Sequence, residues 1–134
     1  MTRERIEQLY YLNIEIMNDT EELVSLKSRA RLGGVWHEGD EVYIAEEERR
    51  LAEKIERCEA ERAVLERFIA DIEDVLTRRI MHLRYERGMS WDAVAFMTGG
   101  INTGEGVRKI AERFLEKTIT GESPRIPPFF KAKP

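Results

Sequence analysis

Two long stretches of the sequence repeat packing residues at alternating spacings of three and four, and this repeat constrains the fold more than any other feature. In residues 3–31 the repeat comprises Ile6, Leu9, Asn13, Ile16, Thr20, Leu23, Lys27 and Ala30. In residues 45–76 it comprises Leu51, Ile55, Cys58, Arg62, Leu65, Ile69, Ile72 and Leu76. Such spacing is typical of helices that pack along a narrow seam. We therefore expect an all-α protein with an N-terminal antiparallel coiled-coil hairpin over residues 1–76, joined by a loop at residues 32–44.

The two repeats also predict a register for this hairpin. If the loop folds back compactly, facing residues have numbers that sum to about 75, so that Asn13 faces Arg62. Each is the only polar residue in the middle of its repeat. A polar pair inside a seam can fix the register of two helices. Alternatively, Arg62 extends its charged end from the edge of the seam into solvent; the sequence leaves both interpretations open.

Residues 71–117 follow a different pattern. An apolar helix is expected up to Gly88, and Ser90 then suits the N-cap of a short helix that ends near Thr98. After a turn, Thr103 suits the cap of a further helix over about residues 103–117, whose apolar side carries Val107, Ile110, Ala111, Phe114 and Leu115. Two helices joined by a short glycine-containing turn predict a helix-turn-helix, followed by an extended tail at residues 118–134.

Four glycines fall within and just after this turn. Gly99 and Gly100 would allow a sharp bend, and Gly104 and Gly106 would leave the first turn of the second helix bare enough to approach DNA closely. A recognition helix needs an exposed N-terminal end and positive charge to meet phosphates and base edges. The DNA-binding residues expected on this basis are Ser90, Thr103, Gly104, Glu105, Arg108, Lys109, Glu112 and Arg113, with Arg78, Arg84 or Arg87 near flanking phosphates.

The distribution of charge agrees with this division. The whole chain has a net charge of −4. Residues 1–76 contain 11 basic and 20 acidic residues, a net of −9, whereas residues 77–117 contain 8 and 5, a net of +3. Residues 118–134 contain 3 and 1, a net of +2. A polyanion is therefore expected to bind the C-terminal part rather than the hairpin.

The segment "LRYERGMSWDAVAFMTGG…NTGEGVRKIAERFLEK" resembles the region-4 helix-turn-helix of bacterial sigma factors. The positions that match are Leu83, Arg84, Tyr85, Gly88, Ser90, Val94, Ala95, Thr103, Val107 and Arg108. Two further segments carry a wider resemblance, a "LYYLNxEI"-like one at residues 9–16 and an "ERxxLExFIxxIED"-like one at residues 61–74. With them, the chain over most of residues 5–117 resembles small phage proteins of Gram-positive hosts, described as ArpU- or RinA-like regulators of late phage transcription. This resemblance implies a DNA-binding regulator of phage or prophage type that contacts double-stranded DNA, with RNA polymerase as a further partner.

Other function classes remain as alternatives or are disfavoured. A phage DNA-packaging subunit of the small terminase kind and a helical protein-interaction module would both suit the same pattern. An enzyme is not expected, because no set of side chains is spaced for nucleophilic catalysis, and one cysteine with two histidines makes no metal set, so that no cofactor is implied. Without a long apolar run or signal peptide, we expect a cytoplasmic protein that binds no membrane. Tyr10, Met17 and Val24 widen the first repeat and suggest a homodimer.

Overall fold

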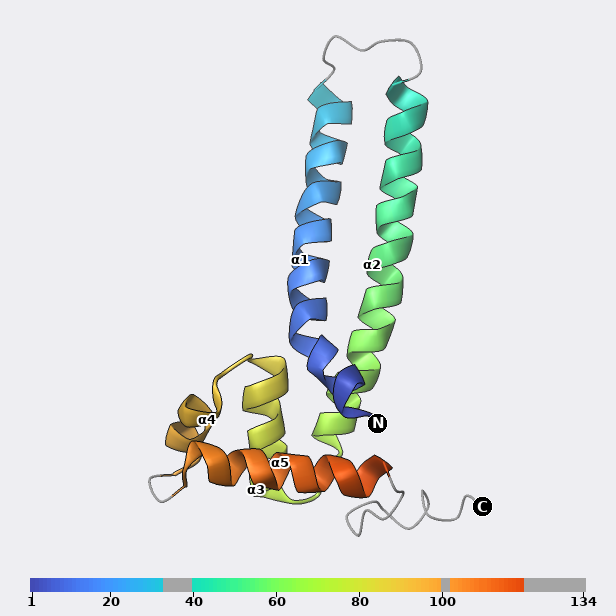
Figure 1. Ribbon diagram of the computed structural model, residues 1–134. Helices are drawn as coiled ribbons and strands as arrows, with labels where there is room; N and C mark the ends of the chain where they lie inside the picture. Colours follow the sequence, from blue (N-terminus) through green and yellow to red (C-terminus); the bar gives the residue numbers. More distant parts are fainter. Residues whose placement is uncertain (33–39, 100–101, 120–134) are drawn as a thin grey trace, which may run out of the picture. The chain divides into compact units, whose positions relative to one another are not determined.

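The structure, a computed structural model, describes residues 1–32, 40–99 and 102–119. In chain order, its regular elements are α1 (Arg3–Leu32), α2 (Asp40–Ala70), α3 (Val75–Met81), the π-helical turn η1 (His82–Glu86), α4 (Trp91–Thr98) and α5 (Gly104–Ile119), all labelled or coloured in Figure 1. The described residues contain helices and no strand, which confirms the predicted all-α class.

The chain forms two compact units. The terminal unit comprises Met1–Tyr10 and Val64–Pro134, and the middle unit comprises Tyr11–Ala63. This division differs from the predicted boundary near residues 71–76, because α1 and α2 each supply residues to both units. Both segments of the terminal unit contribute fully buried apolar residues. Ile6 is one from the first segment, and Leu65 is one from the second.

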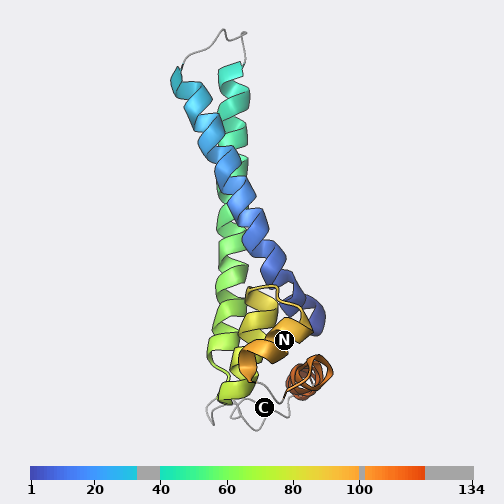
Figure 2. The ribbon, with the colours of Figure 1, turned by 90° about the vertical axis from the view of Figure 1, so that its left-hand side faces the viewer.

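In the middle unit, the segments of α1 and α2 lie side by side and run in opposite directions (Figures 1 and 2). Ile16, Ile44 and Leu51 are buried there. The structure also brings together the two polar residues that the expected register places opposite each other. Arg62 donates a hydrogen bond from Nη1 to Oδ1 of Asn13 at 3.3 Å, so the guanidinium reaches across the unit instead of extending only into solvent.

The buried side of α1 departs from the expected repeat after Ile16. Asp19 is buried, with 7% of its surface exposed, whereas Thr20 is exposed. Likewise Leu26 is half-buried and Lys27 is exposed. Asp19 and Leu26 each precede the expected position by one residue, which is about 100° around the helix. The packed side of α1 therefore turns away from the side that the strict repeat defines.

Asp19 acquires a cation from the facing helix. Lys54 of α2 places its Nζ 3.1 Å from Oδ2 of Asp19 and 2.8 Å from Oε1 of Glu15. Hydrogen bonds to Glu15 and Asp19 raise the pKa of Lys54 above its ordinary value. The carboxylate on the packed side of α1 is therefore paired, as a buried charge must be.

Helix α2 begins five residues earlier than expected. The predicted loop at residues 32–44 is wrong at residue 32 and over residues 40–44, which are helical, and residues 33–39 lie outside the described part of the chain. Asp40 and Glu41 occupy the first turn, where negative charge is favourable, and Ile44 is buried.

Helix α2 also ends at Ala70, before the expected end near Leu76. Asp74 caps the next helix instead, accepting hydrogen bonds from the backbone N–H of Thr77 at 3.0 Å and from its hydroxyl at 2.7 Å. As a result Leu76, the last residue of the predicted repeat, belongs to α3 and is 37% exposed. A local capping interaction thus interrupts a repeat that continues in the sequence.

The terminal unit surrounds one apolar core. Its fully buried members include Leu9, Ile80, Met81, Val94, Val107 and Leu115. Helix α5 packs against both α3 and α4, and the ring of Phe114 lies 5.8 Å from that of Phe68 at the end of α2. One side of α5 is therefore held against the core, and the other side is free to present its charged residues.

Candidate nucleic-acid interface

Two hydroxyl side chains set the start of α4 and α5, as the sequence predicts. Ser90 accepts a hydrogen bond at Oγ from the backbone N–H of Ala93 at 3.2 Å. Thr103 accepts one at Oγ1 from the backbone N–H of Gly106 at 3.0 Å. Because their hydroxyls satisfy helix N–H groups, both residues act first as caps. The two helices are separated by the segment after Thr98, in which Gly100 and Ile101 lie outside the described residues.

The glycines around this segment have different roles from those expected. Gly99 ends α4 with a φ of +129°, a conformation that favours glycine. Gly104 is buried, and a Cβ on it would lie 2.2 Å from Oδ1 of Asp92. It is therefore glycine because α4 approaches α5 there, and the prediction that it lies bare for DNA is wrong. Gly106 is half-buried, next to the Thr103 hydroxyl.

Arg108 lies between two carboxylates of its own helix. Its Nε donates to Oε2 of Glu105 at 3.1 Å, its Nη2 bonds the other oxygen of Glu105, and its Nη1 donates to Oε1 of Glu112 at 2.7 Å. These bonds, to Glu105 first and then Glu112, raise the pKa of Arg108, and the bond from Arg108 lowers the pKa of Glu105. Glu105 and Glu112, both expected to read bases, are thus engaged with Arg108.

Lys109 and Arg113 make up the cationic edge of α5. Both side chains are exposed, and neither forms an ion pair with any residue in the described part of the chain. They lie four residues apart, which places them on neighbouring turns of one helix face. Two exposed cations on one face can contact successive phosphates of a nucleic-acid backbone.

Two of the three arginines expected near flanking phosphates serve the fold. Arg78 donates to the carbonyl oxygen of Ile72 at 2.8 Å, and Arg84 donates to that of Met89 at 2.9 Å. The guanidinium of Arg84 also lies 4.5 Å from the centre of the Trp91 ring. Arg87 is exposed.

Trp91 and two of the nearby methionines, Met81 and Met89, pack within the fold, whereas Met97 does not. The Trp91 ring meets Tyr85 edge-on with the centroids 6.3 Å apart, so packing rather than base stacking accounts for it. Met81 is fully buried and Met89 half-buried. Met97 and its neighbour Phe96 are exposed.

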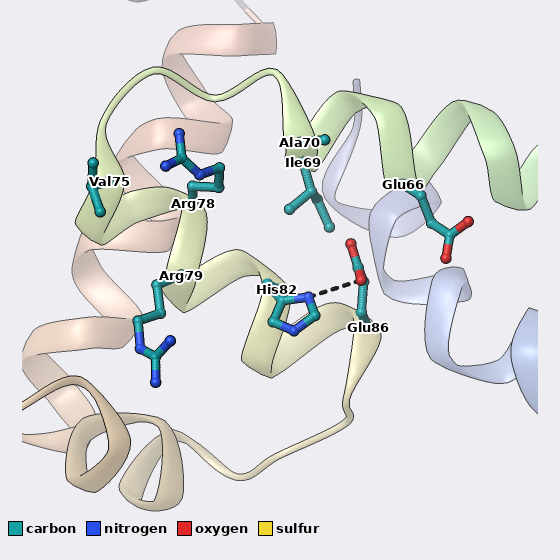
Figure 3. A pocket seen from close by; sticks show the side chains of 8 residues that line it. All are labelled: Glu66, Ile69, Ala70, Val75, Arg78, Arg79, His82 and Glu86. Carbon is teal, nitrogen blue, oxygen red and sulfur yellow. Dashed lines mark hydrogen bonds and ion pairs between the residues drawn. The ribbon is translucent and has the colours of Figure 1, made fainter.

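His82 lies on the rim of a hollow of about 510 Å³ in the terminal unit. Figure 3 shows the hydrogen bond between its Nδ1 and Oε2 of Glu86, which is 2.8 Å long, and two arginines of α3 that also line the hollow, Arg78 and Arg79. The imidazole has a carboxylate partner but no serine, cysteine or threonine lines the hollow with it. This arrangement offers no nucleophile for the histidine to activate.

Arg3 is the residue of this region that the sequence did not indicate. It belongs to the first turn of α1, yet its Nη2 donates to Oε1 of Glu112 at 3.1 Å, and its Nε donates to Glu7 at 3.3 Å. Periodicity describes only neighbours along one helix, and Arg3 and Glu112 are 109 residues apart in the chain. No signal in the sequence could have paired them.

Comparison with family models, curated proteins and solved structures finds no match to this chain. Among the described residues, no helix combines the length and apolar character needed to cross a membrane. The same part of the chain holds no cluster of three or more histidine, cysteine, aspartate or glutamate side chains suited to a metal ion.

Proposed function

We propose that this protein is a DNA-binding transcription regulator whose helix α5 enters the major groove. In this proposal α4 and α5 act as a helix-turn-helix, and the antiparallel helices of the middle unit form a coiled-coil hairpin that carries it. The observation that supports it most is the cationic edge of Lys109 and Arg113, exposed on a helix whose opposite side is anchored in the core by Val107 and Leu115. A recognition helix requires this combination of rigid support and outward positive charge.

The charges of the two units favour the same location. Counted over its full sequence, the terminal unit contains 14 basic and 12 acidic residues, a net of +2, whereas the middle unit contains 8 and 14, a net of −6. Phosphates would be repelled by the middle unit and attracted, more weakly, by the terminal unit. The N-terminal end of α5, where Thr103 caps the helix, adds partial positive charge.

The remaining parts of the proposal concern partners and cellular context. The resemblance to phage late-transcription regulators suggests RNA polymerase as a partner and the cytoplasm of a bacterial host as the location. The apolar side chains that widen the first repeat, Tyr10, Met17 and Val24, are 37%, 56% and 59% exposed, which suits a homodimer. Light scattering over a concentration series separates this proposal from a monomer, and from the many-subunit ring that a packaging protein would form.

Binding to a mixed-sequence 25-base-pair duplex, followed by fluorescence anisotropy over a range of salt concentrations, tests the proposed function. Arg113→Ala should weaken binding and reduce the slope of log affinity against log salt by about one unit. Arg49→Ala removes the same charge from an exposed position of the middle unit and is the matched control, which should leave the slope unchanged. Equal effects of the two substitutions, or no binding by the parent at low salt, would reject the proposal.

A further inference from the structure

The guanidinium of Arg108 keeps two N–H groups available after its contacts with the two carboxylates. An arginine side chain carries five N–H donors. Three are used in the bonds to Glu105 and Glu112, one each from Nε, Nη1 and Nη2. The two that remain, one on Nη1 and one on Nη2, have no partner among the described residues. A pair of donors on the two terminal nitrogens matches the O6 and N7 acceptors that guanine presents in the major groove.

The position of Arg108 is coupled to the first turn of α1. Arg3 and Arg108 donate to the same atom, Oε1 of Glu112, at 3.1 and 2.7 Å. Arg108 and Glu112 are 33% and 27% exposed, so solvent only partly weakens their attraction. Glu112 is thereby held from both sides, and it restricts the rotamers of the arginine that it binds.

We propose that Glu112, held by Arg3, is a positioning residue that converts Arg108 from a phosphate contact into a reader of guanine. The inference rests on the proposed function and adds a specificity device to it. The flanking carboxylates offset the charge of Arg108, which lowers its attraction to the sequence-independent backbone. They also orient its planar fork before DNA arrives, which lowers the entropic cost of the bidentate contact. Affinity for any DNA then depends on Lys109 and Arg113, and choice of base depends on Arg108.

The ion pairs of Arg108 affect DNA binding more than they affect the stability of the fold. Ion pairs between residues three or four apart in one helix contribute little to stability, so holding α5 together does not by itself explain Glu105 and Glu112. Glu105 and Glu112 instead weaken DNA binding, because each places negative charge beside the phosphates. Such a cost is reasonable only if it improves discrimination between sequences.

The test uses the full chain in two measurements, selection from a randomised duplex library and anisotropy on the mixed-sequence duplex at 50 and 200 mM salt. The variants are Glu112→Gln, Arg3→Ala and Arg3→Lys, and Glu73→Gln is the control with the same charge change at an exposed position. Circular dichroism verifies the helix content of each variant.

The parent should select a guanine at one position, with a preference of roughly 5- to 150-fold over other bases. Glu112→Gln should lower this preference at least threefold and bind the mixed duplex more tightly. If Arg108 gains a phosphate, moving from 50 to 200 mM salt should also weaken this variant about threefold more than the parent. Arg3→Ala should lower the preference, and Arg3→Lys should retain most of it.

If the parent binds DNA but Glu112→Gln behaves like Glu73→Gln in both measurements, the positioning role is wrong and the proposed function stands. If Arg3→Lys loses as much preference as Arg3→Ala, the coupling through Arg3 is wrong. If the parent binds no DNA at either salt concentration, the proposed function fails, and the positioning role fails with it.

Discussion

Replacing Gly88 with alanine tests how the start of α1 is joined to the rest of the terminal unit. Gly88 follows η1 with a φ of +69°, and Met89 donates a backbone hydrogen bond to the carbonyl of Leu83 at 3.1 Å, which closes the turn. A Cβ at Gly88 would lie 2.5 Å from Cε1 of Tyr10. The substitution therefore meets two obstacles, a left-handed backbone and an aromatic ring against the new methyl group.

Each obstacle has a magnitude. Alanine in the left-handed conformation costs roughly 1–2 kcal/mol relative to glycine. Moving the Tyr10 ring, which is 37% exposed, forfeits part of its packing, on the order of 1 kcal/mol. We therefore expect Gly88→Ala to lower the free energy of unfolding by about 2–3 kcal/mol.

Urea denaturation followed by circular dichroism measures this loss, and two further variants separate its parts. Gly99 also has a positive φ, but a Cβ there would meet nothing within 4 Å, so Gly99→Ala reports backbone strain alone. In a Tyr10→Ala background, Gly88→Ala should cost about 1 kcal/mol less than in the parent. A loss below about 0.5 kcal/mol in the parent would refute both parts of the reasoning. Equal losses in the two backgrounds would refute the contact with Tyr10.

Two predictions concern the middle unit. Replacing both Asn13 and Arg62 with leucine should preserve or raise the melting temperature measured by calorimetry, whereas Asn13→Leu alone should lower it by removing a partner of a half-buried guanidinium. Lys54 has a raised pKa, so its attraction to Glu15 and Asp19 stabilises the fold below the ordinary value of 10.5 and is lost as the pH rises through the folded value. Above that pH, the urea concentration at the midpoint of unfolding should therefore fall for the parent. The Lys54→Met variant should have a lower midpoint at neutral pH and a smaller fall at high pH. Parallel plots of midpoint against pH for the two proteins would contradict this.

Local and periodic signals in the sequence predicted much of the fold. The caps at Ser90 and Thr103 form hydrogen bonds with N–H groups three residues ahead, an interaction that depends only on nearby sequence. The buried residues of α5, such as Val107 and Ala111, follow the helical period. The proximity of Asn13 to Arg62 followed from pairing the two repeats, because a seam has only a few registers that match apolar residues along its length.

Features that depend on packing between distant segments could not be predicted. From the sequence, Gly104 was expected to leave the start of its helix open to DNA. Only the structure shows that Asp92 lies too close to this position for a Cβ. The end of α2 was missed because apolar residues continue the repeat through a turn that Asp74 caps. The ion pairs of Arg108 could be predicted in part, because Glu105 and Glu112 lie three and four residues away from it, the spacing of neighbours on a helix surface. The link from Glu112 to Arg3 joins the two ends of the described chain.

Lysine footprinting most directly tests the claim that α5 faces DNA. The full chain is acetylated briefly with and without a saturating mixed-sequence duplex, and mass spectrometry gives the rate at each lysine. Lys109 is exposed on the cationic edge of α5, and Lys27, which is also exposed, is the control on α1 in the middle unit. DNA should slow acetylation of Lys109 several-fold and leave Lys27 unchanged, because bound phosphates cover the first and are repelled from the second. Protection of Lys27 with no change at Lys109 would contradict the proposed interface.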